Sequence, residues 1–228
     1  MTGRKWRADE FCVDASVLAP RLLGQYLIHE TPQGLCSGLI VETEAYGGCY
    51  DGFADDGAHS FHGLTKRTAP MFHAGGISYV YLIYGMYCCF NVVTRPAGDP
   101  QAVLIRSAEP LQGLPLMRAR RTRPGKKPPA DRALLTGPGK LCIGMDISRD
   151  LYGEPLWGRR LFLAFGEPVP DTQVVQGPRI NVDYAGEDAL LPLRFGIRDS
   201  RFLSRPFPAA QPQSPGQRSY AQSRKSGG

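Results

Sequence analysis

A run of seven residues places two carboxylates on one face of a predicted strand. Residues 40–46 are mainly β-branched or apolar and contain neither glycine nor proline, which is typical of a β-strand. Because side chains alternate along a strand, Glu42, Glu44 and Tyr46 share one face. A core strand rarely gives one face to two carboxylates. That face is therefore either solvated or lines a cleft.

The second informative segment is an aromatic hairpin. Residues 77–84 and 87–93 are apolar enough to form two strands, and Tyr84, Gly85 and Met86 lie at the turn between them. Turns favour Asn, Asp, Gly and Ser, so a tyrosine and a methionine there need an explanation. The tip either folds back onto the core or forms a wedge that enters a base step or a partner's pocket.

Helices and strands alternate along the rest of the chain. The first helix starts at Asp14 or Ser16 and ends at Gly24, and a later one is capped by Ser107 with Pro110 in its first turn. The other predicted elements are strands at residues 25–31, 35–46, 102–106, 160–165, 180–182 and 193–197, a long polar loop at 47–69, and a helix starting near residue 136. This order predicts an α+β fold with a mostly antiparallel, curved sheet surrounded by helices.

The length of 228 residues is enough for one domain with a full core. Residues 1–203 carry the apolar pattern of such a domain. From residue 204 to residue 228, Pro, Gln, Ser and Gly dominate and apolar residues are few. We therefore expect a single compact domain over residues 1–203 and a disordered C-terminal tail over residues 204–228.

The charge distribution favours a phosphate-rich partner. Lys and Arg number 27 against 21 Asp and Glu, a net charge of +6 that by itself indicates only ordinary solubility. Residues 118–127, however, contain a dense run of Arg and Lys, which favours nucleic acid. No apolar run is long enough to span a bilayer, and residues 1–10 lack the apolar core of a signal peptide. We expect no membrane association and a cytoplasmic location.

The six cysteines form no metal signature, because no two of them are spaced as C-x-x-C. Buried free thiols are the better interpretation, consistent with a reducing compartment. His59 and His62 are three residues apart, but no accompanying zinc-site motif is present. The sequence therefore predicts no metal site.

Glu44 is the candidate for acid–base chemistry. A glutamate on a strand is more often a solvated or ion-paired group than a catalytic one, but Tyr46 on the same face supplies desolvation and a stacking surface. Arg106 follows the apolar residues 103–105 and either meets a carboxylate or reaches water at the strand end. The residues alone leave both alternatives open.

A set of motifs in the same order resembles the alkyladenine (3-methyladenine) DNA glycosylase family. The matching segments are residues 42–46, 56–59, 65–67, 71–72, 79–91, 102–106 with 109–110, 137–142 and 178–180. Each motif is weak by itself, but together they extend from about residue 22 to about residue 197. The loop between Tyr46 and His59 is longer than is usual in the family, and Thr68 stands where many members carry asparagine.

The resemblance implies a role for each matching residue. Glu44 is similar to the family's catalytic base and Arg106 to the arginine that positions the attacking water. Tyr46, His59 and Tyr81 resemble the pocket around the flipped-out base, and Asn91 resembles the asparagine that excludes normal guanine. Tyr84 looks like the side chain that intercalates into DNA from the protruding hairpin. The residues that the resemblance places near the DNA backbone are Met86, Arg67 and Lys140.

The resemblance further implies a monomeric base-excision-repair enzyme that needs no metal or cofactor. Its partner would be double-stranded DNA containing damaged purines: 3-methyladenine, 7-methylguanine, hypoxanthine or ethenoadenine. The expected reaction is hydrolysis of the N-glycosidic bond without strand cleavage, and a bacterial member would associate with the nucleoid. The physical chemistry agrees, since a base within a duplex must be extruded before it can be attacked.

Two other classes of function remain open from the residues. A glycoside hydrolase could use Glu42 and Glu44, which lie roughly 7 Å apart if they are two residues apart on one strand face. Both would approach the sugar from one side, whereas the acid and base must flank the bond. A non-catalytic nucleic-acid-binding module could use the hairpin and the basic run alone, and it would not need Glu44.

Overall fold

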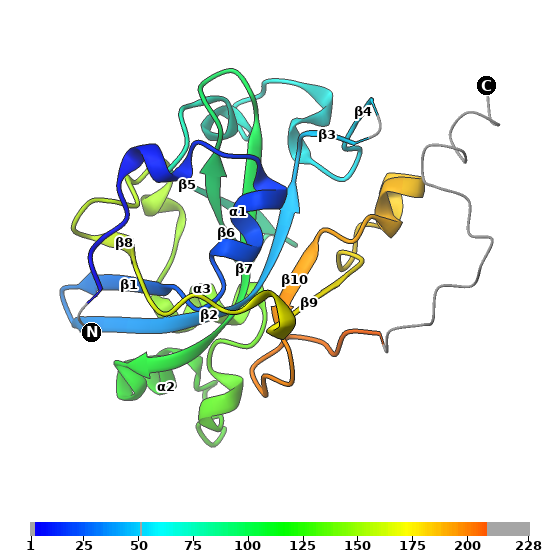
Figure 1. Cartoon of the computed structure of the whole chain (residues 1–228). Coiled ribbons are helices and arrows are strands. Elements are labelled where there is room, and N and C mark those ends of the chain that lie inside the picture. The colour runs from blue at the N-terminus through cyan, green and yellow to red at the C-terminus, as the bar shows by residue number, and fades with distance from the viewer. Residues whose placement is uncertain (1–2, 51, 209–228) are drawn as a thin grey trace.

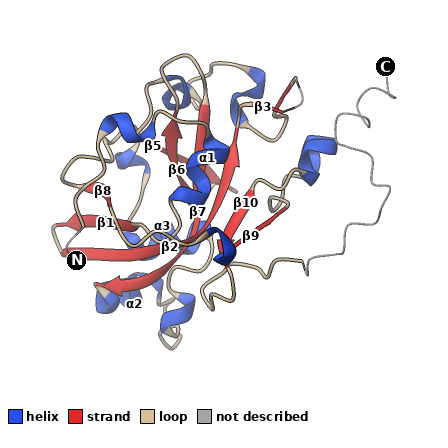
Figure 2. Cartoon of the chain, viewed as in Figure 1, coloured by secondary structure: helices blue, strands red, loops and turns tan. Residues whose placement is uncertain are grey.

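Strand β2 (Gly34–Tyr46) is the longest strand and the centre of the fold in the computed structural model, which describes residues 3–50 and 52–208. It belongs to an eight-stranded antiparallel sheet with the order β5-β6-β7-β2-β1-β8, in which β10 also pairs with β2 and with β9 (Figures 1 and 2). The other strands of this sheet are β1 (Tyr26–Thr31), β5 (Ser78–Ile83), β6 (Tyr87–Thr94), β7 (Gln101–Gln112), β8 (Leu161–Ala164), β9 (Val174–Gly177) and β10 (Arg194–Ile197), while β3 (Cys49–Tyr50) and β4 (Phe53–Ala54) form a separate two-stranded sheet. The helices are α1 (Ala15–Arg21), α2 (Leu114–Arg121) and α3 (Pro138–Met145), with short 3₁₀ turns at Ala8–Phe11, His59–His62, Ala69–Phe72, Asp131–Ala133, Arg149–Leu151, Asp171–Gln173 and Asp183–Leu190. The predicted α+β class with a curved antiparallel sheet is confirmed.

The two halves of β2 have different neighbours along one edge. Its first half pairs with β1, its residues 42–44 pair with β10, and β7 covers the whole of the other edge. Between Ile40 and Thr43 the register with β7 shifts twice, which marks β-bulges. Bulges redirect side chains and increase twist. The carboxylate-bearing end of β2 is therefore enclosed by two strands at the point where the sheet bends.

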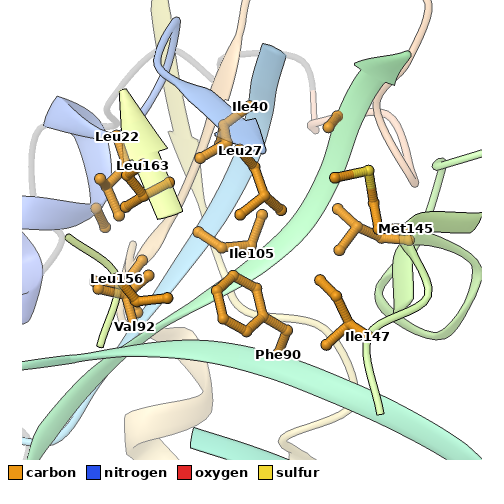
Figure 3. Packing of buried hydrophobic residues seen from close by; sticks show 14 of the residues in the cluster. Leu22, Leu27, Ile40, Phe90, Val92, Ile105, Met145, Ile147, Leu156 and Leu163 are labelled. Atoms are coloured by element: carbon orange, nitrogen blue, oxygen red, sulfur yellow. The ribbon is translucent and has the colours of Figure 1, made fainter. Parts of the chain in front are cut away.

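The largest cluster of buried apolar side chains packs against the sheet. Side chains from β2, β6 and β7 meet those of α1 and α3 in one buried cluster, which includes Ile40, Phe90, Ile105 and Met145 (Figure 3). All four are fully buried, and each such side chain contributes about 1.5–3 kcal/mol relative to exposure. Thr43 faces this core and donates from Oγ1 to the carbonyl of Ala19 in α1 at 2.9 Å. The alternate residues of β2 face the other way, as predicted.

Strands β5 and β6 form the predicted hairpin. At its turn Tyr84 and Gly85 have positive φ angles of 53° and 69°, and the Met86 N–H donates to the Ile83 carbonyl at 3.3 Å. Positive φ at both central residues matches the twist of the two strands. Tyr84 is 77% exposed and Met86 67% exposed. The tip does not fold back onto the core.

Two predicted elements are wrong. No helix starts at Ser107: β7 continues to Gln112, and α2 begins at Leu114 with a different proline, Pro115, in its first turn. Pro110 is accommodated opposite Gly38, next to a register shift where a missing N–H costs little. Residues 180–182 form no strand either, because the positive φ of Asn181 (60°) interrupts extended backbone.

The expected tail begins with residues that lie against the sheet. Ser204 hydrogen-bonds to β2, and the guanidinium of Arg194 in β10 lies 4.0 Å from the ring centre of Phe207. Residues 209–228, the remainder of that tail, lie outside the described part of the chain. All six cysteines are free, as predicted, but the expectation that they are buried holds only for Cys36, Cys89 and Cys142, since Cys88 is half-buried and Cys12 and Cys49 are exposed. Among the described residues, no helix has the length and apolarity needed to cross a membrane.

Candidate active site

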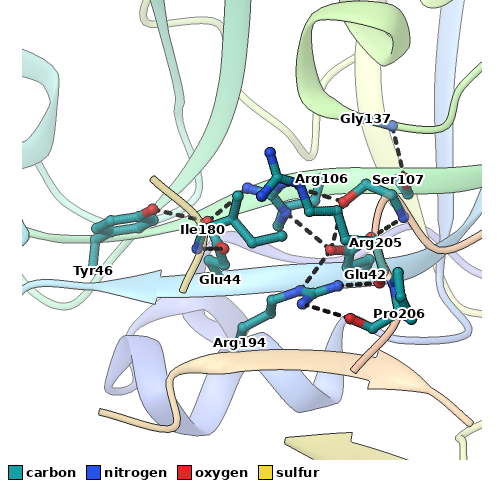
Figure 4. A network of polar contacts seen from close by, with 11 residues as sticks. Glu42, Glu44, Tyr46, Arg106, Ser107, Gly137, Ile180, Arg194, Arg205 and Pro206 are labelled. Atoms are coloured by element: carbon teal, nitrogen blue, oxygen red, sulfur yellow. Dashed lines mark hydrogen bonds and ion pairs between the residues drawn. The ribbon is translucent and has the colours of Figure 1, made fainter. Parts of the chain in front are cut away.

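One guanidinium joins the two carboxylates of β2. Arg106 of β7 donates from Nε to Glu42 Oε1 at 2.9 Å and from Nη1 to Glu44 Oε2 at 3.0 Å (Figure 4). Both carboxylates are fully buried and Arg106 is nearly so. Burial alone lowers the pKa of Arg106, but Glu44 and Glu42 outweigh it and the pKa is raised. Of the two alternatives for Arg106, pairing with a carboxylate is therefore correct.

Glu44 accepts two further hydrogen bonds, one from a residue two positions away and one from a residue far away in the sequence. Tyr46 donates from its phenol to Oε2 at 2.8 Å, and the backbone N–H of Ile180 donates to Oε1 at 2.7 Å. Burial, reinforced by the charge of Glu44, raises the pKa of Tyr46 well above its usual 10, so the phenol remains a donor. A carboxylate has about four acceptor positions. Three donors thus hold Glu44 in place and leave acceptor capacity for water.

Glu42 is bound by two arginines and by Ser204. It accepts from Arg194 Nε at 2.8 Å, and Ser204 donates to it from both its backbone N–H and its hydroxyl, the latter at 2.8 Å. The Ser204 hydroxyl in turn accepts from Arg106 Nη2 at 3.2 Å. Buried charges are tolerated only when paired and hydrogen-bonded. Glu42 thus pairs with both arginines. Glu44 is fully buried and does not itself line the neighbouring cleft, but the three residues that donate to it, Tyr46, Arg106 and Ile180, do.

A cleft of about 690 Å³ opens beside this network. The residues predicted from the sequence that line it are Tyr46, Arg67, His59, Tyr81, Tyr84, Asn91, Arg106 and Lys140. Met86 does not line it and projects into solvent at the hairpin tip. The cleft is the size of a small-molecule or nucleobase site. The roles that the resemblance implies for these residues remain predictions.

Aromatic side chains form one wall of the cleft. His59 meets Tyr81 edge to face, with ring centres 4.6 Å apart, and Tyr79 lies 5.2 Å from Tyr81. The Nδ1 atom of His59 is 3.0 Å from the Tyr79 hydroxyl. Burial lowers the pKa of His59 to about 4, and Arg67 contributes to this shift. Near neutral pH the aromatic side chains of this wall are therefore uncharged.

Asn91 lies on the cleft side of β6 and is nearly fully buried. Its Nδ2 donates to the carbonyl of Tyr79 on the neighbouring strand at 3.0 Å. This bond holds the side-chain amide in one orientation. A fixed amide can exclude or select an exocyclic group, as the resemblance implies.

The long loop after Tyr46 is held by a buried ion pair. Arg179 donates to both oxygens of Asp55, at 2.6 and 2.7 Å, and lies 4.8 Å from the ring centre of Tyr46. Asp55 also accepts the backbone N–H groups of Gly47 and Gly57, each at 2.9 Å. A Cβ at Gly57 would lie only 2.5 Å from the Arg179 guanidinium, so glycine is required there. These bonds anchor the extra loop length and bring His59 to the cleft.

The predicted DNA-backbone residues differ in position. Lys140 lies in the first turn of α3 at the cleft edge, together with Arg121 and Arg123. Arg67 is turned toward the aromatic wall, where its guanidinium is 4.9 Å from the ring centre of Tyr81. In the basic run, Arg118 is paired with Asp131 at 2.7 Å and is less available to phosphates than its sequence position indicates.

Sequence reasoning missed three contributors to the site. The Ile180 N–H donates to Glu44, although the sequence predicts a strand there. Arg194 and Ser204 donate to Glu42, and neither belongs to a recognisable motif. Only the Pro-Arg-Ile pattern at residues 178–180 signalled that this loop matters. Within the described residues, no three His, Cys, Asp or Glu side chains cluster as metal ligands would.

Comparison with known proteins agrees with this geometry. Residues 9–201 match the family described as "Methylpurine-DNA glycosylase (MPG)". A protein of Desulfitobacterium hafniense is 42% identical over 195 residues, covering 84% of this chain and 94% of its own. One of Bacillus cytotoxicus is 44% identical over 201 residues (84% and 95%), and one of Myxococcus xanthus 42% over 201 residues (88% and 94%). Each bears the name "Putative 3-methyladenine DNA glycosylase". The chain belongs to the methylpurine-DNA glycosylase family and is a monofunctional DNA glycosylase.

Proposed function

We propose that this enzyme flips alkylated or deaminated purines out of duplex DNA and hydrolyses the N-glycosidic bond with a water activated by Glu44. Its substrates are 3-methyladenine, 7-methylguanine, hypoxanthine and ethenoadenine, and its product is an abasic site. The observation that carries the proposal is the buried pair of Glu44 and Arg106 beside an aromatic cleft. The protein acts as a monomer and uses no cofactor.

Extrusion of the base comes first. Unstacking a nucleotide costs a few kcal/mol, and damaged pairs reduce that cost. Tyr84, at the exposed end of the β5–β6 hairpin, enters the minor groove and replaces the lost stack. Bulky residues with positive φ are rare and strained, which supports a functional reason for a tyrosine at this turn.

The chemistry follows at the base of the cleft. As the bond between C1′ and N9 breaks, its electron pair goes to the base and positive charge develops on the sugar. The Glu44 carboxylate stabilises that charge and takes a proton from the water whose oxygen bonds to C1′. Arg106 holds Glu44 and orients the water, while the Tyr46 ring stacks on the base. In this scheme Lys140, the lysine at the cleft edge, forms no covalent intermediate, so the strand stays intact.

The two rival functions explain less of the geometry. In a glycoside hydrolase, the acid and base flank the scissile bond. Here Glu42 and Glu44 bind the same guanidinium, that of Arg106, so it lies between the two carboxylates where the sugar would have to be. A binding module without activity would not need Glu44 to be held by three donors.

Cleavage assays on a set of duplexes, each with one damaged purine, test the proposal. Released base is measured directly, and abasic sites are counted after hot-alkali treatment. We expect release from at least one alkylated or deaminated purine and no cleavage before alkali. Absence of release from every duplex, with intact binding, would favour the non-catalytic module.

A further inference from the structure

Arg67 lies on the wall of the cleft. Its guanidinium carbon is 4.9 Å from the ring centre of Tyr81, and its Nη2 atom is 3.4 Å from His59 Nε2. The side chain is exposed to solvent on its outer side. A permanent positive charge therefore borders the space that the aromatic residues enclose.

The loop that carries Arg67 is rigidly connected. Buried Thr68 donates from its hydroxyl to the carbonyl of Gly63 at 3.1 Å and accepts the N–H of Thr65 at 2.8 Å. The hydroxyl of Tyr152 donates to the carbonyl of Lys66 at 2.9 Å. These bonds fix the backbone on either side of Arg67 and direct its side chain to the wall.

Arg67 also determines which atom of His59 carries the proton. A guanidinium has donors only, so its contact with His59 Nε2 requires a bare nitrogen there. The ring proton then lies on Nδ1 and is donated to the Tyr79 hydroxyl at 3.0 Å. His59 has a pKa of about 4, mainly because of burial, so it is neutral near pH 7. Burial also raises the pKa of Tyr79 to about 12. Arg67 is thus the charged member of this wall.

The charge of the departing base differs between the two classes of lesion. A cationic N-alkylated purine receives the electrons of the C1′–N9 bond and leaves neutral. A neutral purine such as hypoxanthine receives the same electron pair and becomes negative as it leaves. A fixed cation beside the base attracts that negative charge in the transition state and repels a base that is still positive.

We propose that Arg67 is a specificity-determining residue that favours neutral purine lesions, such as hypoxanthine and ethenoadenine, over cationic ones, such as 7-methylguanine. The inference rests on the proposed base-excision function and refines its substrate class. Arg67 acts by its charge at the cleft wall, held there by Thr68 and oriented by Tyr81 and His59.

The test is single-turnover excision with enzyme in excess, on duplexes that differ only in hypoxanthine or 7-methylguanine. Rate constants and half-saturation concentrations are measured for wild type, Arg67→Gln and Arg67→Lys. We expect Arg67→Gln to lower the ratio of the excision efficiency on hypoxanthine to that on 7-methylguanine by about tenfold. The effect is no larger because solvent partly screens the charge of Arg67. Arg67→Lys keeps the charge and retains most of the ratio.

Lys140→Gln is the matched control, since it removes one positive charge at the cleft edge away from the aromatic wall. Lys140→Gln should lower the excision efficiency on both duplexes by a similar factor and leave the ratio of the two efficiencies unchanged. If Arg67→Gln lowered the excision efficiency on both lesions equally, the inference would be overturned and Arg67 would be a phosphate contact. Failure of the wild type to release either base would instead refute the proposed function itself. Circular dichroism and thermal unfolding of each variant establish that the fold is intact.

Discussion

Ser204 donates two hydrogen bonds to Glu42, although 162 positions separate them in the sequence. The same hydroxyl accepts from Arg106, so the end of the described chain closes the network under the active site. Glu42 pairs with both Arg106 and Arg194, and Arg106 also pairs with Glu44. Residues 204–207 are therefore part of the buried network around Glu42.

Glu42→Gln should destabilise the protein by about 3–5 kcal/mol, because it leaves a buried guanidinium without its counter-charge. Urea unfolding measures the change. Glu30→Gln, an exposed glutamate on β1, is the control and should change stability by less than about 0.5 kcal/mol. Equal stability of the two variants would show that Glu42 is not the anchor of the network.

Glu44→Gln should abolish base release while preserving affinity for DNA that contains a lesion or an abasic analogue. The amide keeps the shape of the side chain but cannot take a proton, and loss of a general base typically costs about 10²–10⁴-fold in rate. Single-turnover excision and equilibrium binding are measured on the same duplex. A rate near that of wild type would refute the role of Glu44.

Tyr84→Ala should weaken base flipping by about 1–3 kcal/mol, the usual worth of one aromatic stack on a base. The effect should be largest for well-paired lesions in duplex and shrink for mismatched or single-stranded substrates. Tyr84→Phe keeps the ring and should retain activity. Because Tyr84 is 77% exposed, thermal stability should hardly change. Unfolding, or an equal loss on all substrates, would instead identify Tyr84 as a packing residue.

DNA binding should weaken steeply with salt. With about four to six phosphate contacts, the slope of log K against log salt is about −4 to −5. Arg123→Gln, at the cleft edge, should reduce the slope by about 1. Arg118→Gln should change it less, because Asp131 already neutralises that guanidinium. A slope near zero would count against duplex DNA as the partner.

His59 should stay neutral down to about pH 4. Its pKa is lowered by burial and by Arg67, so between about pH 6.5 and pH 4 the unfolded chain binds more protons than the folded one. The contribution of His59 to stability is therefore present above pH 6.5 and is lost as the pH falls through this window. NMR titration of its ring nitrogens checks both the pKa and the Nδ1–H tautomer. Protonation near pH 6.5 would contradict the burial of the ring.

The local sequence pattern was sufficient to predict several features of the site. The period of two along a strand placed Glu42, Glu44 and Tyr46 on one face, because alternation is a property of the extended backbone itself. Gly85 after an apolar run likewise indicated the hairpin turn, since positive φ is a local requirement. The order of motifs indicated the family, which the comparisons then confirmed.

Tertiary structure decided the rest. Whether residues 107–112 form helix or strand depends on pairing with β2, and the long partner strand outweighs the local capping signal of Ser107. Two buried carboxylates require hydrogen-bond donors, and the fold supplies them from distant positions: Ser204, Arg194 and the Ile180 N–H. No local sequence pattern marks these donors. The orientation of Arg67 toward Tyr81 depends in the same way on its loop, to which the distant Tyr152 is hydrogen-bonded. The sequence thus determined which groups share a face, whereas burial and long-range pairing determined which groups they meet.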